Sequence, residues 1–248
     1  MRRSARQKRP VSAPEPAQES PAPKKAKAAR TKVAPAVHTK AKAVLVVLPG
    51  ASGSFSKAMH DLVLSQLSDV VIHNAIDERR RWNTRKAAAP ANFELVRSCC
   101  PSTADLATYG VDTFYVFAHS FGNRVLCEML GAGALRDVCG VILSGFPLYG
   151  PKNNDERVVQ LRLLPATTPA LVLSGDADDF LHRPYLDTAG AALLQATLEA
   201  LAHPAIDVVV LENAGHDLPK TKGKDTAAAT ATRMIESIAS FLTTHRPV

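Results

Sequence analysis

Residues 111–130 read Val-Asp-Thr-Phe-Tyr-Val-Phe-Ala-His-Ser-Phe-Gly-Asn-Arg-Val-Leu-Cys-Glu-Met-Leu. The first half is rich in apolar and β-branched residues, which indicates a buried strand, and the second half has the spacing of a helix. The change of pattern falls within Ala118-His-Ser-Phe-Gly122. Because Ala118 and Gly122 are small, the strand can turn sharply into the helix. The pattern therefore predicts that Ser120 projects its hydroxyl from this corner.

The rest of the chain also alternates short β-branched runs with longer helix-like stretches, which is typical of a parallel sheet covered by helices. We expect about six mostly parallel strands, at residues 43–48, 70–75, 112–118, 138–144, 169–174 and 206–211. We expect helices on both faces, near residues 54–68, 92–108, 121–132, 185–202 and 224–243. The sequence therefore predicts an α/β fold, in which functional groups gather beyond the carboxyl ends of the strands.

Charge divides the chain into two parts. Residues 1–42 hold twelve Lys and Arg against two Glu and consist largely of Ala, Pro and Ser, with almost nothing to bury. We interpret this part as a disordered basic tail and residues 43–248 as a single domain. The whole chain carries a formal charge of +7, so the domain itself is slightly acidic. Only the tail favours a weak, sequence-independent contact with nucleic acid, since no nucleic-acid recognition fold accompanies it.

The tail also bears on localisation. Its two basic clusters, at residues 2–9 and 24–30, have the spacing of a bipartite nuclear signal, while a solubilising tail on a cytoplasmic protein is the alternative. The five prolines at 10–23 argue against the amphipathic helix of a mitochondrial signal. No apolar run is long enough to span a bilayer. The four cysteines show no metal-binding spacing and indicate reduced thiols in a reducing compartment. We expect a soluble protein in the nucleus or cytoplasm.

Two further loops supply partners for a serine nucleophile. The strand that ends at Ser174 leads into Gly175-Asp-Ala-Asp-Asp179, and the last strand leads into Glu212-Asn-Ala-Gly-His-Asp217. The order serine, acid, histidine is the order found in α/β-hydrolases. His216 would be the general base. Asp178 competes with Asp176 and Asp179 for the acid, and its spacing from Gly175 favours it, while Asp179 could cap the following helix.

Backbone donors for a developing oxyanion are also predicted. One is the N–H of Phe121, at the start of the helix after the serine, and the other is the N–H of Ala51 in Leu48-Pro-Gly-Ala-Ser-Gly53. A glycine-rich loop before a helix can also bind phosphate, but both nucleotide-binding glycine motifs are absent. We expect no metal and no cofactor. His119 is interpreted as a packing or supporting residue beside the serine.

Several motifs together resemble the dienelactone-hydrolase-like α/β-hydrolases over residues 43–245. They are the loop at 49–53, the serine turn at 117–124, the segment Leu143-Ser-Gly-Phe-Pro-Leu-Tyr-Gly-Pro-Lys152, and the two loops that contain Asp178 and His216. The branch most similar to this chain contains testis-expressed protein 30 and the hydrolase-like third regulatory subunit of the non-specific lethal histone acetyltransferase complex. Ala118 departs from the family's usual glycine but remains small. The resemblance implies a serine-hydrolase fold, with some members serving as scaffolds.

Two functions follow from these observations. The first is a serine hydrolase that forms an acyl-enzyme at Ser120 and cleaves small soluble esters or thioesters. Its substrates are expected to be short and soluble because the excursion at residues 146–165 is polar and lacks the amphipathic helix of a membrane-active lipase. The alternative is a catalytically idle protein-interaction scaffold, in a chromatin complex as the resemblance implies. The complete set of Ser120, Asp178 and His216 favours the enzyme.

Overall fold

The structure is a computed structural model that describes residues 43–51, 57–74, 82–150, 157–181, 196, 199, 203–221 and 224–246. The predicted tail at residues 1–42 lies outside the described residues. So does almost all of the predicted helix at 185–202, of which only residues 196 and 199 are described, both as helical.

Six parallel strands form one sheet, in the order β2-β1-β3-β4-β5-β6. This arrangement confirms the expected α/β class, with a sheet that is entirely parallel within the described residues. The strands are β1 Ala43–Leu48, β2 Val70–Asn74, β3 Phe114–His119, β4 Val138–Ser144, β5 Ala170–Gly175 and β6 Ile206–Leu211. All residues of β1, β3 and β5 are buried, because these strands are covered on both faces.

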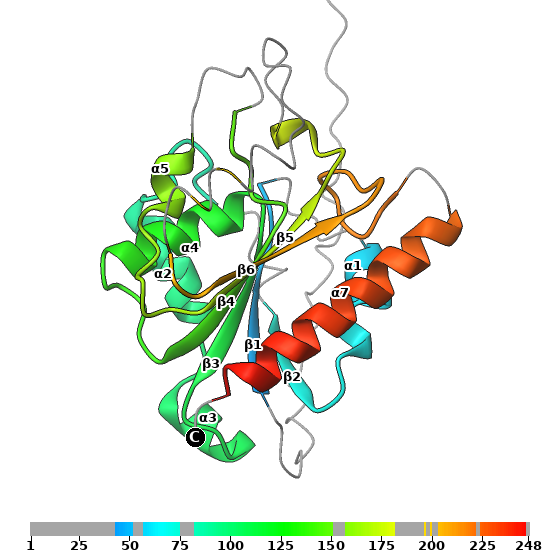
Figure 1. Cartoon of the computed structure of the whole chain (residues 1–248). Coiled ribbons are helices and arrows are strands. Elements are labelled where there is room, and N and C mark those ends of the chain that lie inside the picture. The colour runs from blue at the N-terminus through cyan, green and yellow to red at the C-terminus, as the bar shows by residue number, and fades with distance from the viewer. Residues whose placement is uncertain are drawn as a thin grey trace, which may run out of the picture. The chain divides into compact units, whose positions relative to one another are not determined.

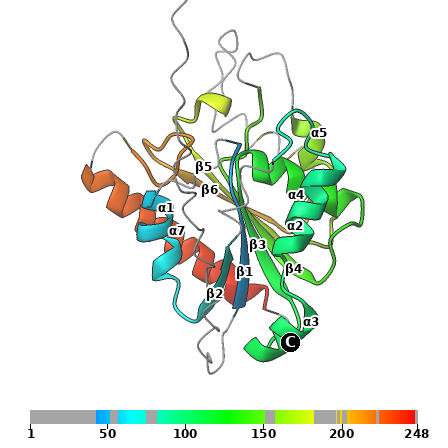
Figure 2. The same ribbon diagram turned by 180° about the vertical axis from the view of Figure 1, so that it is seen from behind.

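Helices cover both faces of the sheet (Figures 1 and 2). One face carries α1 (Lys57–Leu62) and α7 (Lys224–Thr244); the other carries α2 (Pro90–Cys99), α3 (Thr103–Tyr109), α4 (Phe121–Gly131) and α5 (Val158–Leu161). Two short 3₁₀ turns, η1 (Leu64–Gln66) and η3 (Asp179–Leu181), complete the described elements. Within the described parts of the chain, no helix combines the length and apolar character that crossing a bilayer requires.

The single helix predicted at residues 92–108 is wrong: the chain forms α2 and α3 there, with a break between them. Pro101 causes the break, because it lacks an N–H and forces the residue before it out of the helical region. Cys100 accordingly has an extended ψ of 143°. Ser102 then caps α3: its hydroxyl accepts from the backbone N–H of Asp105, whose carboxylate accepts from the Ser102 N–H.

The sheet order reverses between β1 and β3, and this reversal positions the functional residues. The chain passes from β1 outward to β2, then returns to place β3 on the other side of β1. Ligand sites in open parallel sheets lie beyond the carboxyl ends of the strands at such a reversal. Leu48 of β1 pairs with Ala118 of β3, so the loop after β1 and the turn at Ser120 begin side by side.

Gly175, the last residue of β5, lets two functional loops meet. A Cβ atom on Gly175 would lie 2.0 Å from the carbonyl oxygen of Ala214, which is closer than any real contact. That carbonyl accepts a hydrogen bond of 3.0 Å from the backbone N–H of Ala177. The close approach therefore joins the loop after β5, which contains Asp178, to the loop after β6, which contains His216.

Replacing Gly175 with alanine should separate these loops. We predict that Gly175→Ala lowers the free energy of unfolding by about 3 kcal/mol and the melting temperature by roughly 5–10 °C, because the added methyl group cannot be accommodated. Gly215→Ala is the matched control, since its Cβ would lie 3.9 Å from its nearest neighbour, in ordinary contact. Thermal unfolding of both variants checks the prediction, and equal losses would contradict it.

Candidate active site

Ser120 occupies a sharp turn between β3 and α4. Its backbone has φ 50° and ψ −111°, a conformation that is costly for a residue with a side chain, by about 1–3 kcal/mol. The turn is held by the Ser120 N–H, which donates to the carbonyl oxygen of Ser144 over 3.1 Å. A Cβ atom on Gly122 would lie 2.7 Å from the carbonyl oxygen of Leu48, so only glycine fits there. The predicted strand-to-helix corner, with small residues on both sides of the serine, is confirmed.

His216 lies against the serine hydroxyl. Its Nε2 atom is 2.8 Å from Oγ of Ser120, and its Nδ1 atom is 2.9 Å from Oδ2 of Asp178. An ionised carboxylate can only accept a hydrogen bond, so Nδ1 carries the imidazole proton. The lone pair of Nε2 is then directed at the hydroxyl of Ser120. This is the arrangement in which a histidine can remove a proton from a serine.

The acid in this chain of hydrogen bonds is Asp178, whose side chain is fully buried. Its second oxygen, Oδ1, accepts the backbone N–H of Phe180 at 2.8 Å. Asp176 and Asp179, the two alternatives in the same loop, are exposed. The structure therefore brings together Ser120, His216 and Asp178 from the ends of three different strands.

The two predicted oxyanion donors, Phe121 and Ala51, both belong to segments that begin next to Ser120. Phe121 is the first residue of α4, where a backbone N–H has no partner within the helix and the helix dipole favours negative charge. Ala51 follows Gly50, and a Cβ atom on Gly50 would lie 3.2 Å from Cβ of Ser120. The backbone that leads into Ala51 thus runs along the serine. Residues 52 and 53 of the glycine-rich loop lie outside the described residues.

His119, which the sequence suggested was a packing or supporting residue, also makes specific polar contacts. The residue is only 4% exposed, and Nδ1 lies 3.1 Å from the carbonyl oxygen of Ser144. Burial, reinforced by the nearby charge of His216 and partly offset by Asp217 and Asp178, lowers the pKa of His119 to about 4. Nothing in the sequence pattern around the serine indicates these contacts, because they come from loops that are distant along the chain.

Burial makes at least three of the four cysteine thiols poor nucleophiles. All four lie within the described residues, and none of them forms a disulfide. Burial raises the pKa of Cys100 to about 12 and also raises the pKa of Cys127 and of Cys139, which disfavours the reactive thiolate. Among the described residues, no group of three or more His, Cys, Asp and Glu side chains is arranged to hold a metal ion.

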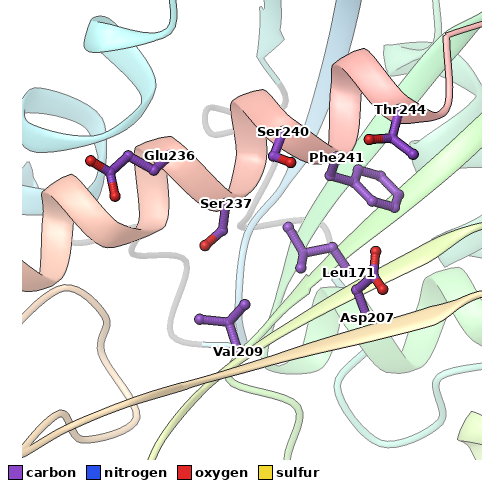
Figure 3. A pocket seen from close by; sticks show the side chains of 8 residues that line it. All are labelled: Leu171, Asp207, Val209, Glu236, Ser237, Ser240, Phe241 and Thr244. Atoms are coloured by element: carbon purple, nitrogen blue, oxygen red, sulfur yellow. The ribbon is translucent and has the colours of Figure 1, made fainter.

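A hollow of about 370 Å³ lies elsewhere, between the α7 helix and strands β5 and β6 (Figure 3). Leu171 and Asp207, which line it, belong to the amino-terminal halves of β5 and β6, whereas Asp178 and His216 follow the carboxyl ends. This hollow is therefore not part of the site around Ser120.

A family model described as an alpha/beta hydrolase domain matches residues 43–243, and the chain belongs to this family. No curated protein matches the sequence.

Solved structures share the fold. The esterase domain of a Rhodothermus marinus protein is 16% identical with a TM-score of 0.52, over 83% of this chain and 90% of that one. An alpha-beta serine hydrolase homologue from Coxiella burnetii is 13% identical with a TM-score of 0.54, over 81% of this chain and 86% of that one. A Pyrococcus furiosus esterase is 11% identical with a TM-score of 0.54, over 84% of each chain. At these identities the likeness establishes the fold alone.

The lowered pKa of His119 should make stability depend on pH. The folded protein keeps His119 neutral down to about pH 4, whereas the unfolded chain binds a proton near 6.5, so a falling pH favours the unfolded chain. We predict that His119 does not lower the free energy of unfolding above pH 6.5. Between pH 6.5 and pH 4 its titration should lower the free energy of unfolding by roughly 3 kcal/mol. Urea denaturation at several pH values checks this. His119→Asn should lack that part of the decline, and an unchanged pH dependence would contradict the prediction.

Proposed function

We propose that the protein is a serine hydrolase that cleaves small soluble esters or thioesters through an acyl-enzyme on Ser120. The observation that carries this proposal is the continuous set of hydrogen bonds from Ser120 through His216 to the buried Asp178. A buried carboxylate bonded to an imidazole that contacts a serine hydroxyl in a strained turn has a direct chemical use in acyl transfer.

In the proposed reaction, Nε2 of His216 takes the proton of Ser120 as Oγ attacks the acyl carbon. The imidazolium is stabilised by the carboxylate of Asp178, which stays ionised. The tetrahedral intermediate collapses when Nε2 returns the proton to the departing alcohol or thiol. A water molecule then gives its proton to His216 and attacks the acyl-enzyme, which releases the acid and restores the serine hydroxyl.

The backbone N–H groups of Ala51 and Phe121 would stabilise the negative charge on the acyl oxygen in both steps. The position of Phe121 at the start of α4 and the closeness of Gly50 to Ser120 support this role. Neither donor depends on a side chain, so substitutions at these two positions should affect the charge stabilisation only through the backbone.

The resemblance to the branch of testis-expressed protein 30 and the regulatory subunit of the histone acetyltransferase complex supports a second candidate, a scaffold that binds proteins. For either candidate function, the sequence of the basic tail would favour a nuclear or cytoplasmic location. The same tail would make weak contacts with nucleic acid. A scaffold has no need for the buried carboxylate and the contact between His216 and Ser120, so these favour the enzyme.

A fluorophosphonate probe distinguishes the two candidates. We predict that the folded wild-type protein is labelled covalently and that Ser120→Ala is not, because only the activated hydroxyl attacks phosphorus. His216→Ala should lose nearly as much reactivity as Ser120→Ala, since the groups act as a unit. Labelling is measured by intact mass, with circular dichroism as the control for folding. A folded wild-type protein that remains unlabelled would favour the scaffold.

Two variants in the same loop test whether Asp178 is the acid of the proposed triad. Asp178→Asn should reduce kcat for an activated ester by roughly 10³- to 10⁴-fold, because the amide no longer holds the productive form of the imidazole. Asp176→Asn makes the same chemical change two residues away at an exposed position and should keep nearly full activity. If Asp176→Asn were the crippling variant, the assignment of the acid would be wrong.

Short, soluble substrates are proposed from the segment between β4 and β5. The described helix there, α5, is only four residues long, although residues 151–156 lie outside the description. We predict that p-nitrophenyl esters with two to four acyl carbons are hydrolysed without a jump in rate at the critical micelle concentration. A sharp rate increase when a longer ester forms micelles would contradict this prediction.

A further inference from the structure

The buried residue His119 lies beside the proposed base without belonging to the hydrogen-bonded chain. It is the last residue of β3 and directly precedes Ser120. The centroid of its ring is 5.1 Å from that of His216, with the two planes at 43°. A buried imidazole at this position carries a desolvation cost, so its contacts require an explanation beyond the filling of space.

The ring of His119 makes one hydrogen bond and lies close to two backbone segments. Nδ1 must carry its proton, because its partner, the carbonyl oxygen of Ser144, can only accept. Another part of the ring lies close to the backbone of Gly50, where an added Cβ atom would be 3.1 Å from Cδ2. A third part lies close to the backbone of Gly145, where an added Cβ atom would be 3.2 Å from Cε1. The hydrogen bond and these two backbone neighbours restrict the orientation of the ring.

The imidazole of His216 needs such a neighbour. A hydrogen bond from Nδ1 to Asp178 fixes one end of the ring but still allows it to pivot about that bond. The ring of Phe180, with its centroid 4.4 Å away, and the ring of His119 are the two aromatic contacts that His216 makes among the described residues. Displacement of a reacting group by about 1 Å can cost a hundredfold in rate, so these contacts bear directly on catalysis.

The charge state of His119 suits this position. With its pKa lowered to about 4, the ring is neutral at neutral pH. During the proposed reaction His216 becomes positively charged, and a second cation beside it would oppose proton transfer from Ser120. The nearby carboxylate of Asp217, with Oδ1 at 3.9 Å from Nε2 of His119, is 58% exposed and too distant for a hydrogen bond.

We propose that His119 is a positioning residue whose fixed, neutral ring holds the imidazole of His216 with Nε2 directed at Ser120. This inference rests on the proposed hydrolase function. It concerns a residue that acts through the base and does not itself exchange a proton with the substrate.

The test compares two substitutions of His119. An asparagine side chain in its place would retain an amide N–H where Nδ1–H donates to Ser144 but would remove the ring surface. His119→Asn should reduce kcat for p-nitrophenyl acetate by roughly 10- to 100-fold while KM changes less than about threefold, because substrate binding does not involve the ring. His119→Phe, which keeps a flat ring and loses the donor, should retain more of kcat than His119→Asn. The matched control is His60→Asn on the surface of α1, which should leave both constants unchanged.

A double-mutant cycle then separates positioning of the base from a general structural effect. In a His216→Ala background, His119→Asn should reduce the residual rate by less than about threefold, because the group through which it acts is absent. The proposal is overturned if His119→Asn is as active as wild type, if it matches or exceeds His119→Phe, or if its effect is as large without His216. A wild-type protein that neither hydrolyses esters nor reacts with fluorophosphonate would instead overturn the proposed function.

Discussion

The carbonyl oxygen of Ser144, at the carboxyl end of β4, is the acceptor around which the site is built. It receives the backbone N–H of Ser120 at 3.1 Å, the side-chain amide of Asn123 at 2.8 Å and Nδ1 of His119 at 3.1 Å. One buried acceptor thus fixes the strained turn, the first turn of α4 and the ring beside the base. Since β4 lies in the interior of the sheet, the acceptor cannot move without disturbing both neighbouring strands.

The strands were predictable because continuous runs of apolar and β-branched residues leave a strong sequence signal, even in the edge strand β6, where only Leu211 is buried. Residues 43–48, 138–144 and 206–211 form strands with the expected bounds. The helix expected at 92–108 was wrong, because helix-like apolar spacing continues on both sides of Pro101 and conceals the break. A backbone effect of one residue, the missing N–H of proline, overrode that spacing.

The site was predictable where it depends on chain order and on spacing within one loop. The position of Asp178 after Gly175 favoured the residue that the structure brings to His216. The contacts of His119 could not be predicted, since they depend on the pairing of His119 with Ser144 across two strands and on backbone from distant loops. The close approach of Gly175 to Ala214 is likewise a property of the folded sheet. Short-range patterns in a sequence do not report such contacts.

In the proposed reaction, Ser120 forms a covalent acyl intermediate with the help of His216 and Asp178. Rapid mixing with p-nitrophenyl acetate, followed by an acid quench and mass spectrometry, detects this intermediate. We expect a burst of p-nitrophenol that approaches one equivalent per active enzyme, together with an increase in mass of one acetyl group that peptide mapping places on Ser120. Hydrolysis without any acylated Ser120, or acylation at another residue, would contradict the proposed reaction.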